Sequence, residues 1–147
     1  MILLDTDVIL ELTRSQPDPT VMVFLRRQPP QTLFTASVCE AEMHYGLARM
    51  PAGRRRNDLT SRVTAFLATA FAGRIMASDT AAAALCGAIR AEREAAGKPV
   101  SVQDAMIAAT ARVHGLTVVT RNVADFKALG VELLNPFFAA TSGRSVR

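Results

Sequence analysis

The chain opens with a short apolar run, Met1–Leu4, that ends abruptly at Asp5. Four apolar residues in succession, without alternation, are typical of a strand that is buried on both faces. Such strands belong to parallel sheets, in which helices connect one strand to the next. An acid directly after a buried strand also lies at the edge where α/β proteins place their functional groups. This feature therefore predicts both a fold class and the place of a site.

The rest of the sequence alternates short apolar runs with longer amphipathic segments. We expect further strands at 32–36, 74–77, 116–120 and 131–134, and helices from Val8 to just before Ser15 and at 20–27, 37–50, 54–72, 79–96 and 101–114. This alternation favours a single α/β domain with a central parallel sheet flanked by helices on both faces. We expect the domain to span residues 1–138, followed by a short basic tail at 139–147.

Composition excludes several classes of protein. Half of the 147 residues are hydrophobic and 20% are charged, which argues against a disordered chain. No apolar run reaches the roughly 18 residues of a membrane span, and Asp5 interrupts any signal peptide. Cys39 and Cys86 have no partner at metal-binding spacing, so we expect both to be buried thiols of a reducing compartment. These features predict a cytoplasmic protein without a membrane segment.

The charge balance is compatible with a nucleic-acid ligand. Seventeen basic residues stand against 13 acidic ones, for a net charge of +4. Most of the basic residues are arginines, which suit bidentate contacts with phosphate. Charge alone does not establish such binding, because many basic proteins bind no nucleic acid.

Several acids lie in apolar stretches, where burying a carboxylate is costly unless it has a structural or functional partner. Helix capping explains some of them. Asp7 directly precedes an apolar helix and fits the N-cap position better than Asp5 does, and Glu40 completes a capping box that begins at Ser37. Asp5 and Glu42 are explained less well in this way, so we expect both to be site residues.

Three further polar residues have two interpretations each. Asp104 completes a capping box with Ser101, but it also opens an almost wholly apolar helix that must be central, which favours a functional role. Asn122 and Asp125 follow the strand expected at 116–120. They are either site residues beyond the carboxyl end of that strand or turn and cap residues.

Carboxylates that converge on one crevice repel one another and need a cation to compensate them. His44 and His114 are isolated, so clustered oxygen ligands favour Mg²⁺ or Mn²⁺ over zinc. A cation held in this way can activate a water molecule against a phosphodiester. An acidic crevice in an arginine-rich chain thus suggests metal-dependent cleavage of a nucleic acid.

Four segments together resemble a known family. They are Met1–Val8, Glu42–Leu47, Val102–Ala111 and Val119–Phe126, and they occur in the order and spacing of PIN-domain ribonucleases. The chain resembles VapC toxins, close to the FitB branch, of bacterial type II toxin–antitoxin systems. The resemblance runs from Met1 to about Phe138, and residues 134–137 end the domain as the family does.

This resemblance implies a site of defined composition. Mg²⁺ or Mn²⁺ would be bound chiefly by Asp5 and Asp104, with Glu42 completing the acidic site. The family places a fourth acid, or an Asn, at the position of Asn122 and often has another acid slightly later, here Asp125, and which of the two faces the metal stays open. The family usually has Asn where this chain has Asp7, so Asp7 either assists the site or caps the helix. Small hydroxyl residues that line such pockets are Thr6, Ser37 and Thr120.

The resemblance also implies partners. The family forms homodimers and pairs with a cognate antitoxin that carries a DNA-binding domain, and the complex commonly binds promoter DNA. RNA would follow a basic rim, for which the candidates are Arg26, Arg27, Arg54, Arg55, Arg56 and Arg121. The alternative for the three consecutive arginines is a solvated helix start.

Two other functions are alternatives to a nuclease. Asp5-Thr6-Asp7 after an apolar strand is similar to the opening of haloacid-dehalogenase-type phosphatases, in which the first Asp is a nucleophile. That fold needs a later Lys with an adjacent acidic pair, which Lys98 lacks, and it leaves Glu42 unexplained. The second alternative is a PIN-like module that binds RNA or an antitoxin without cutting, which the substitution at Asn122 makes conceivable.

Overall fold

The computed structural model describes residues 1–138, so the tail expected at 139–147 lies outside the described residues. Five strands form a sheet in the order β3-β2-β1-β4-β5, and every neighbouring pair is parallel. The strands are β1 (Ile2–Leu4), β2 (Leu33–Ala36), β3 (Ile75–Met76), β4 (Thr117–Val119) and β5 (Leu133–Leu134). All five were predicted from the sequence, within a few residues at each end.

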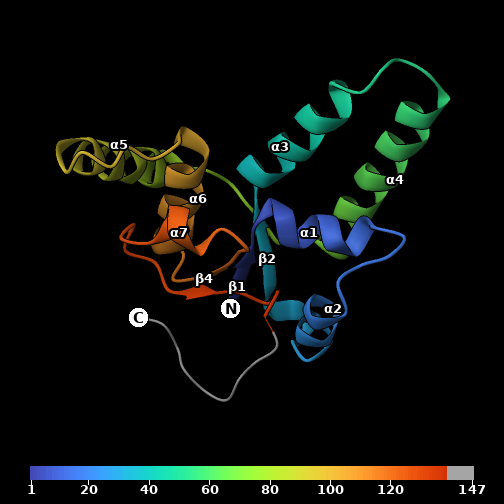
Figure 1. Cartoon of the computed structure of the whole chain (residues 1–147), viewed down its shortest axis with the longest axis horizontal. Helices are drawn as coiled ribbons and strands as arrows, with labels where there is room; N and C mark the ends of the chain where they lie inside the picture. Colours follow the sequence, from blue (N-terminus) through green and yellow to red (C-terminus); the bar gives the residue numbers. More distant parts are fainter. Residues whose placement is uncertain (139–147) are drawn as a thin grey trace.

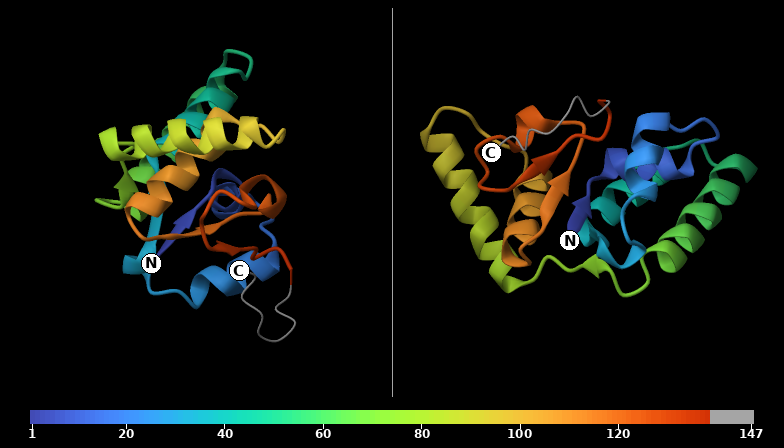
Figure 2. Two further views of the ribbon diagram at one scale, coloured as in Figure 1. Left: turned by 90° about the vertical axis from the view of Figure 1, so that its left-hand side faces the viewer. Right: turned by 90° about the horizontal axis from the view of Figure 1, so that it is seen from below.

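Helices connect the strands and cover both faces of the sheet (Figure 1). Before β3 come α1 (Thr6–Thr13), α2 (Pro19–Arg26), α3 (Ser37–Ala48) and α4 (Arg54–Ala70), and after it come α5 (Thr80–Ala95), α6 (Val102–Val113) and α7 (Val123–Phe126). Right-handed crossovers place helices on opposite faces when the strand order reverses. Figure 2 shows this division, with the sheet between α1–α4 and α5–α7. The predicted fold class is confirmed, whereas α7 and the 3₁₀ turn Pro30–Thr32 were not predicted.

Side-chain caps and one glycine fix where several of these helices begin and end. Asp18, Asp79 and Ser101 each accept a hydrogen bond from a backbone amide of the first turn that follows. Gly115 has a φ of +63° after α6, and the amide of Leu116 donates to the Ala111 carbonyl at 2.8 Å. This left-handed turn closes α6 and starts the chain toward β4.

Two predictions about caps were wrong. The N-cap of α1 is Asp5, which accepts from the Thr6 amide, whereas Asp7 lies inside the helix. No capping box forms at Ser37, because β2 runs directly into α3 and Ser37 is already helical. Its hydroxyl oxygen instead accepts from the Ser78 amide at 3.3 Å. Ser101 is confirmed as the N-cap of α6, with the Asp104 amide donating to its hydroxyl at 3.0 Å, but the Asp104 carboxylate accepts from that same hydroxyl rather than from the Ser101 backbone amide of a capping box.

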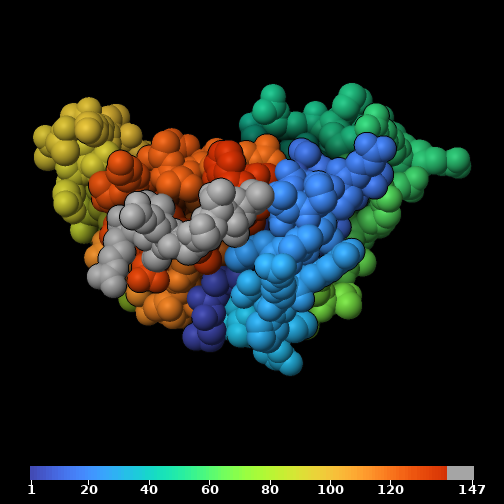
Figure 3. Space-filling model, turned by 60° about the horizontal axis from the view of Figure 1, so that its bottom comes forward, coloured from blue at the N-terminus to red at the C-terminus, as the bar shows by residue number. Residues whose placement is uncertain are grey.

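The core lies along β1 and β4 and against α6. Leu3, Leu4, Val118 and Val119 are fully buried, and most of the apolar residues of α6 are buried as well. In the space-filling view (Figure 3), the first residues of the chain lie between the α1–α2 side and the C-terminal side. Among the described residues, no helix has the length and apolar character that crossing a bilayer requires.

One buried acid joins parts of the chain that are distant in sequence. Glu11 in α1 is only 1% exposed, and its role was not predicted from the sequence. Its carboxylate pairs with Arg14 at 3.0 Å and with Arg121 at 3.3 Å, and it accepts from the Asp18 amide at 2.8 Å. Arg121 also lies over the Phe137 ring, 3.9 Å from its centroid. Glu11 therefore fixes the start of α2 and the segment after β4 against α1.

We expect Glu11→Ala to lower the free energy of unfolding by about 2–4 kcal/mol, because it leaves the Asp18 amide and two arginines without their acceptor. Urea denaturation measures this change. Glu94→Ala is the control, since Glu94 forms an exposed pair with Arg90 at 3.7 Å and should cost less than about 0.5 kcal/mol. Equal losses in the two variants would contradict the structural role of Glu11.

Candidate acidic site at the switch in strand order

The candidate site lies where the strand order changes direction. From β1 the chain proceeds through β2 to β3 on one side, whereas β4 and β5 lie on the other. Connections that leave two adjacent strands in opposite directions open a crevice at their carboxyl ends. Asp5 follows β1 and Thr120 follows β4, and the Asp5 amide donates to the Val119 carbonyl at 3.0 Å. The chain thus brings residues 5 and 120 together at this crevice.

Asp5 is the buried acid of the site, with 6% of its surface exposed. Its carboxylate accepts from the Thr120 hydroxyl and from the Thr6 amide, each at 2.7 Å. The pKa of Asp5 is raised to about 6, chiefly by burial; the hydrogen bonds from Thr120 and Thr6 lower it, and the negative charges of Asp7 and Glu42 add to the rise. A buried carboxyl group with a raised pKa can exchange its proton for a cation.

Glu42 lies beside Asp5. Cys39 and Glu42 are on α3, three residues apart, and a ligand atom from each lies within 4.8 Å of one on Asp5. The Thr6 hydroxyl donates to the Glu42 carboxylate at 2.5 Å, which fixes that side chain against α1. The prediction that Cys39 is a buried thiol is confirmed, but its place beside both acids was missed, although helical spacing puts it on the Glu42 face.

The donor set of this cluster fits a hard cation. Burial, together with the Asp5 charge, raises the pKa of the Cys39 thiol to about 12, so the thiol stays protonated at neutral pH. That leaves the carboxylates of Asp5 and Glu42 as the available ligands of the cluster. Carboxylate oxygens suit Mg²⁺ or Mn²⁺, whereas zinc favours thiolate or imidazole ligands.

Asp104 and Asp125 do not belong to this cluster. Asp104 is partly buried at the start of α6, where its carboxylate accepts from the Ser101 hydroxyl at 2.7 Å. Asp125 is exposed in the short helix α7. Both acids remain predictions of the resemblance.

Asn122 contacts the site through two hydrogen bonds. Its backbone amide donates to the Thr120 hydroxyl oxygen at 3.0 Å, and its side-chain amide donates to the Asp7 carboxylate at 3.2 Å. Of the other residues expected to line the site, Thr6 and Thr120 each donate to one of its acids. Ser37 instead connects the start of α3 to the segment after β3.

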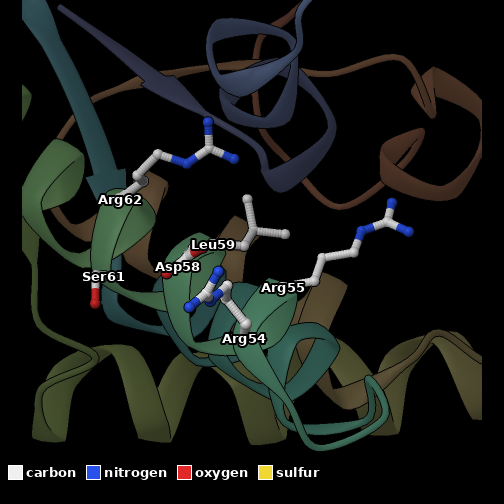
Figure 4. Close-up of a pocket in the computed structure, with 6 residues that line it drawn as sticks. All are labelled: Arg54, Arg55, Asp58, Leu59, Ser61 and Arg62. Atoms are coloured by element: carbon white, nitrogen blue, oxygen red, sulfur yellow. The ribbon is translucent and has the colours of Figure 1, made fainter.

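The arginines expected to contact RNA lie in different places. Arg54 and Arg55 line an open hollow of about 1000 Å³ on α4, together with Asp58, Leu59, Ser61 and Arg62. In Figure 4, Arg55, Leu59 and Arg62 project to the same side of α4. A smaller pocket beside it is lined by Leu59 and Arg62 together with Leu12 and Thr13 of α1. Arg121 is held by Glu11 and Phe137, which favours a structural role for it.

The fold and the site define an α/β protein that can hold a divalent cation on carboxylates at its strand-order switch. Comparison with known proteins agrees with this class. The PIN domain family matches residues 2–131, and the chain belongs to that family. The expectation drawn from the four sequence segments is confirmed.

The relatives include VapC and FitB proteins. The chain is 38% identical over 137 residues to VapC ribonuclease Y4jK of Sinorhizobium fredii, covering 93% of this chain and 98% of the relative. It is 37% identical to Toxin FitB of Neisseria gonorrhoeae, covering 93% and 99%. A solved structure of FitAB bound to an IR36 DNA fragment superimposes with a TM-score of 0.85 at 37% identity, covering 95% of this chain and 97% of the other.

The raised pKa of Asp5 predicts a pH dependence of stability. The folded chain binds this proton more tightly than the unfolded chain, whose Asp pKa is about 4. The free energy of unfolding should therefore fall as the pH rises from about 4 to about 6, by up to about 3 kcal/mol from Asp5 alone. Asp5→Asn, which keeps an acceptor for the Thr6 amide, should lack this component.

Urea denaturation in EDTA at pH 4.5 and pH 7.5 tests the expectation. Relative to the wild type, the Asn variant should gain stability at the higher pH. The same difference between the two proteins at both pH values would contradict burial of the Asp5 charge.

Proposed function

We propose that this protein is a metal-dependent endoribonuclease that acts as the toxin of a type II toxin–antitoxin pair. The observation that carries the proposal is the buried Asp5 carboxylate beside Glu42 at the strand-order switch. The relatives named VapC ribonuclease and FitB toxin support the same activity. The proposed cofactor is Mg²⁺ or Mn²⁺.

Each acid has a proposed role. Asp5 and Asp104 hold the cation, and Glu42 completes the acidic site. Asp104 would have to share its carboxylate with Ser101, whose hydroxyl now donates to it. Asp125 is retained as a predicted outer acid, since it follows Asn122 by three residues.

The bound cation supplies a water of lowered pKa and neutralises charge that develops on the phosphodiester. The surrounding chain prepares the acids for it. Thr120 fixes one oxygen of Asp5, and Thr6 fixes one oxygen of Glu42, so both carboxylates have defined orientations before the cation arrives. Preorganisation of this kind lowers the cost of assembling a reactive site.

RNA is proposed to lie along α4. Acids alone repel a phosphate backbone, so a substrate needs positive charge outside the acidic site. The hollow beside Arg54, Arg55 and Arg62 offers that charge on an exposed surface. Contacts of this kind bind phosphates without choosing a sequence.

The proposed protein partners are a second copy of the chain and a cognate antitoxin with a DNA-binding domain. The FitAB structure bound to a DNA fragment supports an assembly on promoter DNA. We place this activity in the cytoplasm, where RNA is available and the two buried cysteines remain free thiols. Membership of the PIN domain family leaves the phosphatase alternative without support. Cleavage of RNA by the purified chain distinguishes a nuclease from the non-cutting module.

We expect the purified chain, free of antitoxin, to cleave end-labelled total RNA in Mg²⁺ or Mn²⁺ and not in EDTA. Asp5→Asn should lower the cleavage rate by at least about 100-fold, because it removes a cation ligand that also fixes the site. Circular dichroism of the variant at pH 7 shows whether it is folded. Cleavage in EDTA, or equal cleavage by the variant, would refute the nuclease assignment. Metal and RNA binding without cleavage would favour the non-cutting module.

A second prediction concerns the arginines of α4. Replacing both Arg55 and Arg62 with Ala should weaken the binding of a catalytically inactive chain to single-stranded RNA. It should also reduce the slope of log affinity against log salt by about 1.4, at about 0.7 for each lost phosphate contact. Fluorescence anisotropy at several salt concentrations measures the slope. The paired control is Arg90→Ala with Arg93→Ala on α5, across the sheet, which should leave the slope unchanged.

A further inference from the structure

Asp7 is joined to Asp5 through the segment after β4. The Thr120 hydroxyl donates to Asp5 at 2.7 Å and accepts from the Asn122 backbone amide at 3.0 Å. The Asn122 side chain then donates to Asp7 at 3.2 Å. Residues 120 and 122 therefore present hydrogen-bond donors to both acids of the Asp5-Thr6-Asp7 segment. The carboxylates at the N-cap and in the first turn of α1 are therefore both held by the segment 120–122.

Helix capping does not account for Asp7. The N-cap position of α1 is occupied by Asp5, and the hydrogen bond found for the Asp7 carboxylate comes from Asn122 rather than from a helix-end amide. Asp7 is partly buried, and its charge is close enough to Asp5 to raise the pKa of that carboxyl. A first-turn acid stabilised only by the helix dipole would need no partner 115 residues away.

We propose that Asp7 is a further carboxylate of the cation site, held in position by Asn122, and that it supplies the acid that position 122 lacks. The assignment rests on the proposed function of the site. It adds Asp7 to the proposed set of Asp5, Glu42 and Asp104.

The direction of the hydrogen bonds explains why the charge lies on Asp7. Asn122 donates the two hydrogen bonds that it makes to Thr120 and Asp7, so its partners at the site must be acceptors. An acid at both positions would set two carboxylates about 3 Å apart, which strongly disfavours ionising both of them. With one acid and one amide, positions 7 and 122 carry a single negative charge. Exchanging the two residue types between these positions should keep one charge and the hydrogen bond between them.

The exchange supplies the test. Mn²⁺ binding to the full chain is measured by calorimetry and by the loss of the free-ion electron paramagnetic resonance signal. Asp7→Asn should raise the dissociation constant by about 10–100-fold, the range seen when a group that supports a metal site is removed. The double variant Asp7→Asn with Asn122→Asp should return it to within about threefold of the wild-type value.

Glu40→Gln is the matched control, because it removes one negative charge from the first turn of α3 without touching the cluster. Its Mn²⁺ affinity should stay within about twofold of the wild type. Thermal unfolding in EDTA shows that each variant is folded at the temperature of the binding experiment.

The outcomes separate this inference from the function on which it rests. If Asp7→Asn binds Mn²⁺ as the wild type does, or if Glu40→Gln weakens binding as much, the role of Asp7 is overturned while the nuclease proposal stands. A double variant that binds no better than Asp7→Asn also overturns it. If the wild-type chain shows no Mn²⁺ binding that Asp5→Asn removes, the proposed function and the role of Asp7 both fail.

Discussion

The hydrogen bond from Thr120 to Asp5 is the contact on which the site depends. It joins the ends of β1 and β4, which are 115 residues apart in the chain and adjacent in the sheet. The pairing of these strands buries the Asp5 carboxylate, and the hydroxyl compensates part of the cost of burial. The acidic site can form only after β4 has paired with β1. Formation of the site is therefore coupled to assembly of the sheet.

The segment after β4 serves the site and the fold at once because its side chains alternate in direction. Thr120 and Asn122 face Asp5 and Asp7, whereas Arg121 between them reaches Glu11 further along α1. The same three residues therefore hold the acids of the site and neutralise a buried acid of the core. This explains how α1 can carry two acids after its N-cap Asp5.

The sequence predicted most of the fold because its local signals agree. Each of these local patterns favours one kind of element: the continuous apolar run at β1, the glycine after α6 and the apolar α6. The predicted α/β sheet is confirmed. Contacts that depend on distant partners escaped prediction. Glu11 looks like an ordinary helix residue until Arg121 is placed beside it, and the choice of Asp5 over Asp7 as N-cap depends on where β1 ends. The short helix α7 has too few residues to show a period.

The acidic cluster and the arginine-lined hollow lie on different elements, and this separation follows from electrostatics. Acidic side chains that can hold a cation repel the phosphate backbone that the cation would act on. Positive charge placed among them would compete with the cation for the same carboxylates. A surface on α4 avoids that competition, because Arg54, Arg55 and Arg62 line a hollow in which Asp58 is the one acid. On the function proposed for this chain, affinity for RNA would come from the exposed arginines and cleavage from Asp5 and Glu42, so substitutions at one surface should leave the other property largely intact.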